Sequence, residues 1–82
     1  MTRTIEELEN FPIIGTFYHD RELWQACEEI VVNVNNPLDL RIRAIKVIDR
    51  IIGEERGSVT EADVTLFMEQ LGRDPVTGEL DV

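Results

Sequence analysis

The segment from residue 37 to residue 56 limits most strongly what this chain can fold into. It follows the motif Asn-Asn-Pro, in which Asn36 is expected to cap a helix and Pro37 to take its first position. Asp39 then falls in the first turn, where a carboxylate suits the positive end of the helix dipole. These signals predict a helix that begins at Pro37 and continues to about residue 56.

Apolar side chains dominate the surface of this predicted helix. At about 100° per residue, the charged residues 39, 43, 46 and 50 fall within a stripe of about 60°. Most of the remaining circumference is apolar and comprises Leu38, Leu40, Ile42, Ala44, Ile45, Val47, Ile48, Ile51 and Ile52. Such a helix has to be covered on nearly all sides. Because a short chain can barely supply that cover, self-association is expected.

A second helix is predicted over residues 61–71. Thr60 is the expected N-cap, and Asp63 takes the capping-box position that Glu usually occupies. The apolar residues recur at the spacing of one helical face and are Val64, Phe67, Met68 and Leu71. Gly72 follows, and glycine readily adopts the left-handed conformation that ends many helices.

A third helix is predicted over about residues 20–34. Asp20 is the expected N-cap, and apolar residues recur at helical intervals from Leu23 to Val34. An alternative stays open, because the run Ile-Val-Val-Asn-Val at residues 30–34 is β-branched and favours a strand by propensity.

A short helix is predicted near the N-terminus. Thr4 and Glu7 have the spacing of a capping box, and Phe11 and Pro12 should end the helix. Together these elements predict an all-α fold, a small compact bundle of three main helices (about 20–34, 37–56 and 61–71) plus this short N-terminal helix.

The whole chain, residues 1–82, is expected to form a single domain with a thin core, because 82 residues bury only roughly 60–65% of their unfolded surface. Residues 73–82 contain Asp-Pro and Thr-Gly turn signals and few apolar side chains. A loosely held C-terminal tail is therefore expected there.

The chain is acidic, with a net charge of −9, but residues 41–50 form a basic segment. Arg43, Lys46 and Arg50 would lie in one stripe that invites comparison with a phosphate-binding surface. The acids outnumber the bases by 17 to 8, however, and phosphate binding needs a positive field. We therefore expect no direct nucleic-acid binding and a stripe that faces acids of neighbouring helices, such as Glu28, Glu29 or Glu69.

The single cysteine, Cys27, cannot form an intrachain disulfide, which favours a reducing compartment. No apolar run reaches the roughly 20 residues that span a bilayer, and the N-terminal residues lack the order of a signal peptide. The sequence predicts a cytoplasmic protein without a membrane segment.

Residues that could support catalysis or ligand binding are few. His19 and Asp20 could contribute to a metal site, but the chain has no second histidine. Cys27 falls on the apolar side of its helix, where a thiol without a basic neighbour stays protonated. The glycines form no phosphate loop, and residues 74–79 lack the alternating oxygen ligands of a calcium loop. The sequence therefore predicts no enzyme activity, metal or cofactor.

Four of the five aromatic residues lie between residues 10 and 25. They could form a lid over one end of the core, because large rings cover much surface. Alternatively, Tyr18 and Trp24 could form an exposed patch that binds a partner, since these residue types dominate interface hot spots. Only their exposure separates the two interpretations.

These features favour a non-catalytic protein-protein interaction or regulatory protein, expected as a homodimer whose partner surface includes the central helix. An acid of the second chain is expected to pair with Arg41 at the edge of the seam. The alternative is an acidic DNA mimic that inhibits a nucleic-acid-handling protein, as small proteins of phages and mobile elements do. The candidate partner-binding residues are Arg41, Ile45, Ile48, Ile52, Tyr18 and Trp24.

Overall fold

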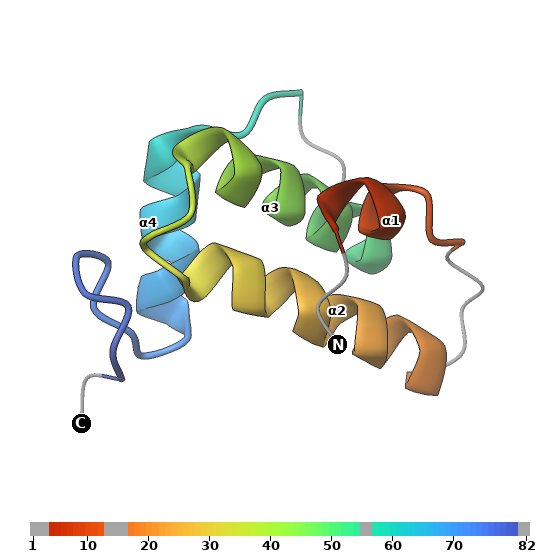
Figure 1. Ribbon diagram of the computed structural model, residues 1–82, viewed down its shortest axis with the longest axis horizontal. Helices are drawn as coiled ribbons and strands as arrows, with labels where there is room; N and C mark the ends of the chain where they lie inside the picture. The colour runs from red at the N-terminus through yellow and green to blue at the C-terminus, as the bar shows by residue number, and fades with distance from the viewer. Residues whose placement is uncertain (1–3, 13–16, 55–56, 81–82) are drawn as a thin grey trace.

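The computed structural model describes residues 4–12, 17–54 and 57–80. In these residues the chain forms α1 (Ile5–Glu9), α2 (Phe17–Val32), α3 (Leu38–Ile52) and α4 (Glu61–Gln70) (Figure 1). The described residues contain no strand. Arg73 and Leu80 form an isolated antiparallel bridge. The predicted all-α fold, with three main helices and a short N-terminal one, is confirmed.

Helices α2 and α3 run antiparallel and side by side through the middle of the molecule (Figure 1). Residues 33–37 connect the end of α2 to the start of α3. Both α1 and α4 pack against this pair, and α4 crosses it steeply near the connection (Figure 1). Among the described residues, α1 and α4 do not contact each other. The pair of α2 and α3 therefore holds the other two helices separately.

One apolar core lies between the helices, and even α1, with 5 residues, buries Ile5 and Leu8 in it. Each such side chain stabilises the fold by about 1.5–3 kcal/mol relative to its exposed state. The buried apolar residues are Ile5, Leu8, Leu23, Cys27, Val31, Ala44, Ile45, Val47, Ile48, Val59, Val64 and Met68.

The start signals of α1 and α4 are where the sequence predicts them. Thr4 is the N-cap of α1, and its Oγ1 accepts a hydrogen bond from the Glu7 backbone N–H at 3.3 Å. Thr60 is the N-cap of α4, and its backbone N–H donates to Oδ2 of Asp63 at 2.8 Å. The left-handed Gly72, with φ 73°, follows α4 as expected.

The bounds of α3 differ from the prediction at both ends. Pro37 is the N-cap rather than the first helical residue. Asn36 acts on the preceding helix instead, because its Nδ2 donates to the carbonyl oxygen of Ile30 at 3.0 Å. At the other end, Gly53 adopts φ 77° and closes α3 after Ile52, so the predicted extension is wrong for residues 53 and 54, and residues 55–56 lie outside the described ones.

Helix α2 begins at Phe17, so Asp20 lies in its first turn and is not the predicted N-cap. An acid in the first turn is still favourable because it faces the positive end of the helix dipole. Residues 30–32 continue α2, and the strand alternative is wrong for them. Val31 is completely buried in the core, and this burial outweighs the β propensity of the run.

The described part of the C-terminal tail forms a small hairpin rather than an irregular coil. Within it, the backbone N–H of Asp74 donates to the carbonyl oxygen of Glu79 at 2.8 Å. The Arg73 guanidinium donates to the carbonyl oxygen of Gly78 at 2.7 Å. Gly78 is buried, and its backbone lies against the carbonyl of Val32 at the end of α2. How loosely this hairpin is held in solution stays a prediction.

Candidate functional site

The side chain of Arg41, at the start of α3, forms hydrogen bonds with other residues of the same chain. Its Nε donates to the carbonyl oxygen of Val31 at 2.7 Å, and its Nη2 donates to Sδ of Met68 at 2.8 Å. The Val31 carbonyl belongs to the last turn of α2, where carbonyl oxygens lack partners within the helix. Arg41 therefore satisfies the end of α2 and links it to α4.

The predicted partner of Arg41 is an acid of a second chain, whereas the hydrogen bonds of its side chain go to a backbone carbonyl and to sulfur within this chain. Burial lowers the pKa of the Arg41 guanidinium, and the carboxylate of Glu61 opposes that shift. Because an arginine stays protonated at physiological pH, a fixed cation lies at the junction of α2, α3 and α4.

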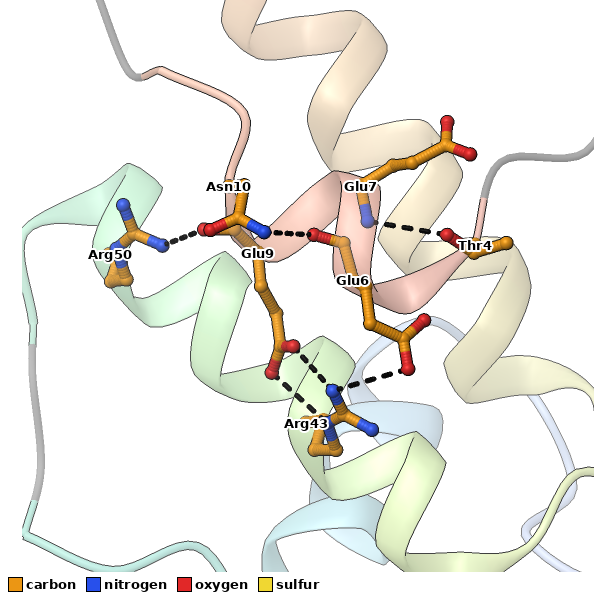
Figure 2. A network of polar contacts seen from close by, with 7 residues as sticks. All are labelled: Thr4, Glu6, Glu7, Glu9, Asn10, Arg43 and Arg50. Atoms are coloured by element: carbon orange, nitrogen blue, oxygen red, sulfur yellow. Dashed lines mark hydrogen bonds and ion pairs between the residues drawn. The ribbon is translucent and has the colours of Figure 1, made fainter.

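Two arginines of the basic stripe on α3 hold α1 in place, as Figure 2 shows. The Arg43 guanidinium donates to both carboxylate oxygens of Glu9, with 3.0 Å between Nε and Oε2, and lies 3.8 Å from Oε1 of Glu6. Arg50 donates through Nη1 to the backbone carbonyl of Glu9 at 2.8 Å. That carbonyl lies in the last turn of α1, so a cation there also complements the helix dipole.

The paired side chains of Arg43 and Glu9 shift each other's ionisation. The hydrogen bond from Arg43 is the main cause that lowers the pKa of Glu9 from its usual 4.5. The same bond raises the pKa of Arg43. The acids predicted to face this stripe lie on the longer helices, but Arg43 and Arg50 instead bind the short N-terminal helix.

An open groove of about 280 Å³ lies on the other side of α3. Its position follows from the helical wheel, because the isoleucines that line it are about 160° from the basic stripe. Helices α3 and α4 form its walls, together with one residue of α2. Its apolar lining includes Trp24, Ile45, Ile48, Ile52, Leu66 and Phe67.

The apolar residues lie at different depths in this groove. Ile45 and Ile48 are each 2% exposed and form its floor. Ile52 and Leu66 are 50% and 51% exposed and lie at its mouth. The rings of Trp24 and Phe67 are tilted by 48° with centroids 6.1 Å apart, a spacing at which aromatic pairs attract.

The polar residues at the edge of the groove carry negative charge or none. They include Glu54, Asp63 and Gln70, and Glu54 is exposed to solvent. None of the basic residues in the described ranges lines the groove. An apolar surface with an acidic edge is thus presented by a chain whose net charge is −9.

Four of the residues predicted to bind a partner, Trp24, Ile45, Ile48 and Ile52, line this groove. The predictions place Trp24 and the isoleucines on separate surfaces, and the fold brings them together. Ile45 and Ile48 are covered by the chain's own helices, so only Ile52 of the predicted seam is substantially exposed. Arg41 is not among the lining residues, and the side chain of Tyr18 lies outside the described residues.

The residues that complete the groove on the α4 side are not among those predicted to bind a partner. Leu66 is apolar but lies about 150° from the centre of the helical face predicted for residues 61–71. An apolar side chain outside the apolar face of an amphipathic helix is the signal that could have identified it. Glu54 follows Gly53, and placing it at the groove requires knowing that α3 ends there.

The described residues include Cys27, the one cysteine of the chain. Burial raises the pKa of the Cys27 thiol to about 12, which keeps it protonated at neutral pH. No group of three or more His, Cys, Asp or Glu side chains in the described part of the chain is arranged to hold a metal ion. Within those same ranges, no helix has the length and hydropathy needed to cross a membrane.

Comparisons of the chain with protein-family models, with curated proteins and with solved structures found no match. A functional conclusion therefore rests on the groove and its surroundings.

Proposed function

We propose that this chain is a non-catalytic interaction or regulatory protein of the cytoplasm, and that it binds another protein through the groove between α3 and α4. The observation that carries this proposal is the exposure of Ile52 and Leu66 beside the Trp24–Phe67 ring pair. An apolar cluster in which exposed aliphatic side chains adjoin partly buried aromatic rings is typical of protein-binding surfaces.

The open form of the groove also supports a protein partner over a small ligand. Small-molecule pockets usually enclose about 300–1,000 Å³ and bury most of the ligand. The groove, at about 280 Å³, is close to the lower end of that range, but it is open to solvent along its mouth. A groove of this kind accommodates a few side chains that project from a larger partner.

A second copy of this chain is the partner expected from the sequence. Because Ile45 and Ile48 lie inside the single chain, such a dimer would use mainly the apolar surface at the mouth of the groove. The location in the cytoplasm is supported by Cys27, an unpaired thiol of the kind that reducing compartments preserve.

The experiment that tests this proposal compares three versions of the full chain as bait in cell extracts of the source organism. Leu66→Ser removes apolar surface at the mouth of the groove, and Leu38→Ser removes a similarly exposed leucine outside it. Each partner captured by the wild type is then purified and titrated against all three. Loss of binding with Leu66→Ser alone is the expected result. Equal binding by both variants would contradict the proposal.

A further inference from the structure

We infer that the groove binds an amphipathic helix of another protein, one that carries lysine or arginine beside its apolar face. This inference rests on the proposed function and adds the chemistry of the partner segment. Three properties of the groove lead to it: its apolar lining, its position between helices and its acidic edge.

The apolar lining favours a partner that inserts apolar side chains into the groove through its mouth. Ile45 and Ile48 form a buried floor, and the exposed Ile52 and Leu66 stand on either side of the mouth. A row of apolar side chains on one face of a helix, spaced at i, i+3, i+4 and i+7, can fill a groove of this form.

The fold favours a helical partner over an extended one. Binding of an extended peptide usually adds a strand to the exposed edge of a sheet. The described residues contain no sheet, and their one antiparallel bridge lies in the C-terminal hairpin. The groove is instead bordered by α3 and α4, the arrangement in which helices dock between helices.

The charge around the groove favours a basic partner over a second copy of this chain. Glu54 is exposed at its edge, and no described cation lines it. The arginines of α3 are engaged elsewhere, Arg41 with Val31 and Met68, and Arg43 with Glu9. A second copy would bring the same acidic edge and a further net charge of −9. Like charges across an interface oppose association, whereas lysine or arginine would be attracted.

The test uses the full chain and its own fluorescence, because Trp24 is the only tryptophan and lines the groove. The probe is a helical peptide of about 16 residues, with leucines along one face and lysines beside them. One matched peptide has glutamate in place of every lysine. The other has its leucines rearranged so that no face is apolar. The lysine peptide should shift the Trp24 emission and bind at least about tenfold more tightly than either matched peptide.

Substitutions in the protein locate the binding surface. Leu66→Ser should weaken binding of the lysine peptide about tenfold, and Leu38→Ser should bind like the wild type. Glu54→Gln should weaken binding about two- to threefold. Its matched control is Glu79→Gln, an exposed acid outside the groove, which should leave binding unchanged.

The outcomes separate this inference from the proposed function. No change in Trp24 emission at about 100 μM lysine peptide, with helical circular dichroism intact, overturns the inference. Preferred binding of the glutamate peptide also overturns it and leaves a protein-binding groove in place. Wild-type dimers that Leu66→Ser dissociates and Leu38→Ser does not would make a second copy the occupant, again overturning the inference alone. The proposed function fails separately, if Leu66→Ser retains every captured partner.

Discussion

The guanidinium of Arg41 donates to the carbonyl oxygen of Val31 across 2.7 Å, ten residues earlier in the chain. The bond joins the first turn of α3 to the last turn of α2, so the antiparallel pair is fixed at its connected end. A helix end that is partly buried needs such a partner, since the last carbonyls have none within the helix.

Replacing Arg41 by Met, which retains an apolar stem, should lower the free energy of unfolding by about 1.5–3 kcal/mol. The reason is that the carbonyl of Val31 loses a charged donor in a partly buried place. Urea unfolding followed by circular dichroism measures the change. Arg50→Met, which removes an exposed bond to the Glu9 carbonyl, is the control and should cost less. Equal losses in the two variants would refute this role of Arg41.

The pairing of Glu9 with Arg43 should make stability depend on pH in the acid range. The pKa of Glu9 is lowered in the folded state, so the unfolded chain binds more protons there. The pairing therefore stabilises the fold fully above the unfolded pKa, and this contribution disappears as the pH falls through the folded value.

Comparison of wild type with Glu9→Gln tests this dependence. The variant should be less stable at about pH 7, and the difference should shrink as the pH falls below the ordinary carboxyl pKa of 4.5, as measured by urea unfolding. The effect should be small because the pair is partly exposed, and salt should reduce it. Glu7→Gln, a change to an exposed acid of the same helix, serves as control. A difference that persists at low pH would exclude this explanation.

Replacement of two glycines by alanine measures how firmly the C-terminal hairpin is held. Gly53 and Gly78 share a φ of 77°, so alanine is strained at both, by about 1–2 kcal/mol. Only at Gly78 would the new Cβ meet another atom, 2.5 Å from the carbonyl oxygen of Val32. A firmly packed hairpin predicts that Gly78→Ala is the more destabilising in urea unfolding. A loose tail, as the sequence predicts, would move away and make Gly78→Ala the milder change.

Glutamate substitutions on α3 should distinguish its buried positions from its exposed ones. Ile48→Glu places an unpaired charge in the core and should unfold the chain, at a cost of several kcal/mol. Ile52→Glu, at the mouth of the groove, should leave the helical circular dichroism unchanged.

Analytical ultracentrifugation of the wild type then addresses the predicted homodimer. A strict monomer at about 500 μM would rule that dimer out.

The thiol of Cys27 should react with alkylating reagents only when the fold opens. Its pKa of about 12 and its complete burial leave neither thiolate nor access at neutral pH. Labelling under native conditions should therefore be slow and should accelerate in urea, in parallel with unfolding. Rapid labelling of the native chain would contradict the burial of this residue.

Cys27→Ser should lower the free energy of unfolding by roughly 1 kcal/mol, because it places a hydroxyl group among apolar side chains.

Local signals in the sequence identified most of the helices and the places where α1 and α4 begin. Thr4 and Thr60 act through bonds to residues three positions away, so their effect is visible in a short window. Gly53 has the same left-handed conformation as Gly72, but the apolar run before it suggested a longer helix. Gly72 is predicted to end its helix, whereas the prediction for α3 takes no account of the equivalent signal at Gly53.

The groove could be predicted only in part because its walls come from different helices. The isoleucines on α3 were recognised through an excess of apolar surface, and Trp24 through its residue type. Their meeting with Leu66 depends on the angle at which α4 crosses the pair, which a one-dimensional pattern does not contain. For the same reason, the acids opposite Arg43 were sought on the long helices instead of on α1.

Because α1 contacts α2 and α3 but not α4 within the described residues, the chain should open in stages. The departure of α1 would uncover Ile5 and Leu8 but leave the contacts between α4 and the central pair intact. Amide hydrogens of α1 should then exchange with solvent before those in the middle of α3. Salt should speed this first stage by screening Arg43 from Glu9, whereas the apolar contacts beneath α4 should withstand it. The attachment of α1 would therefore respond to the salt concentration, whereas the packing of α4 against the central pair would not.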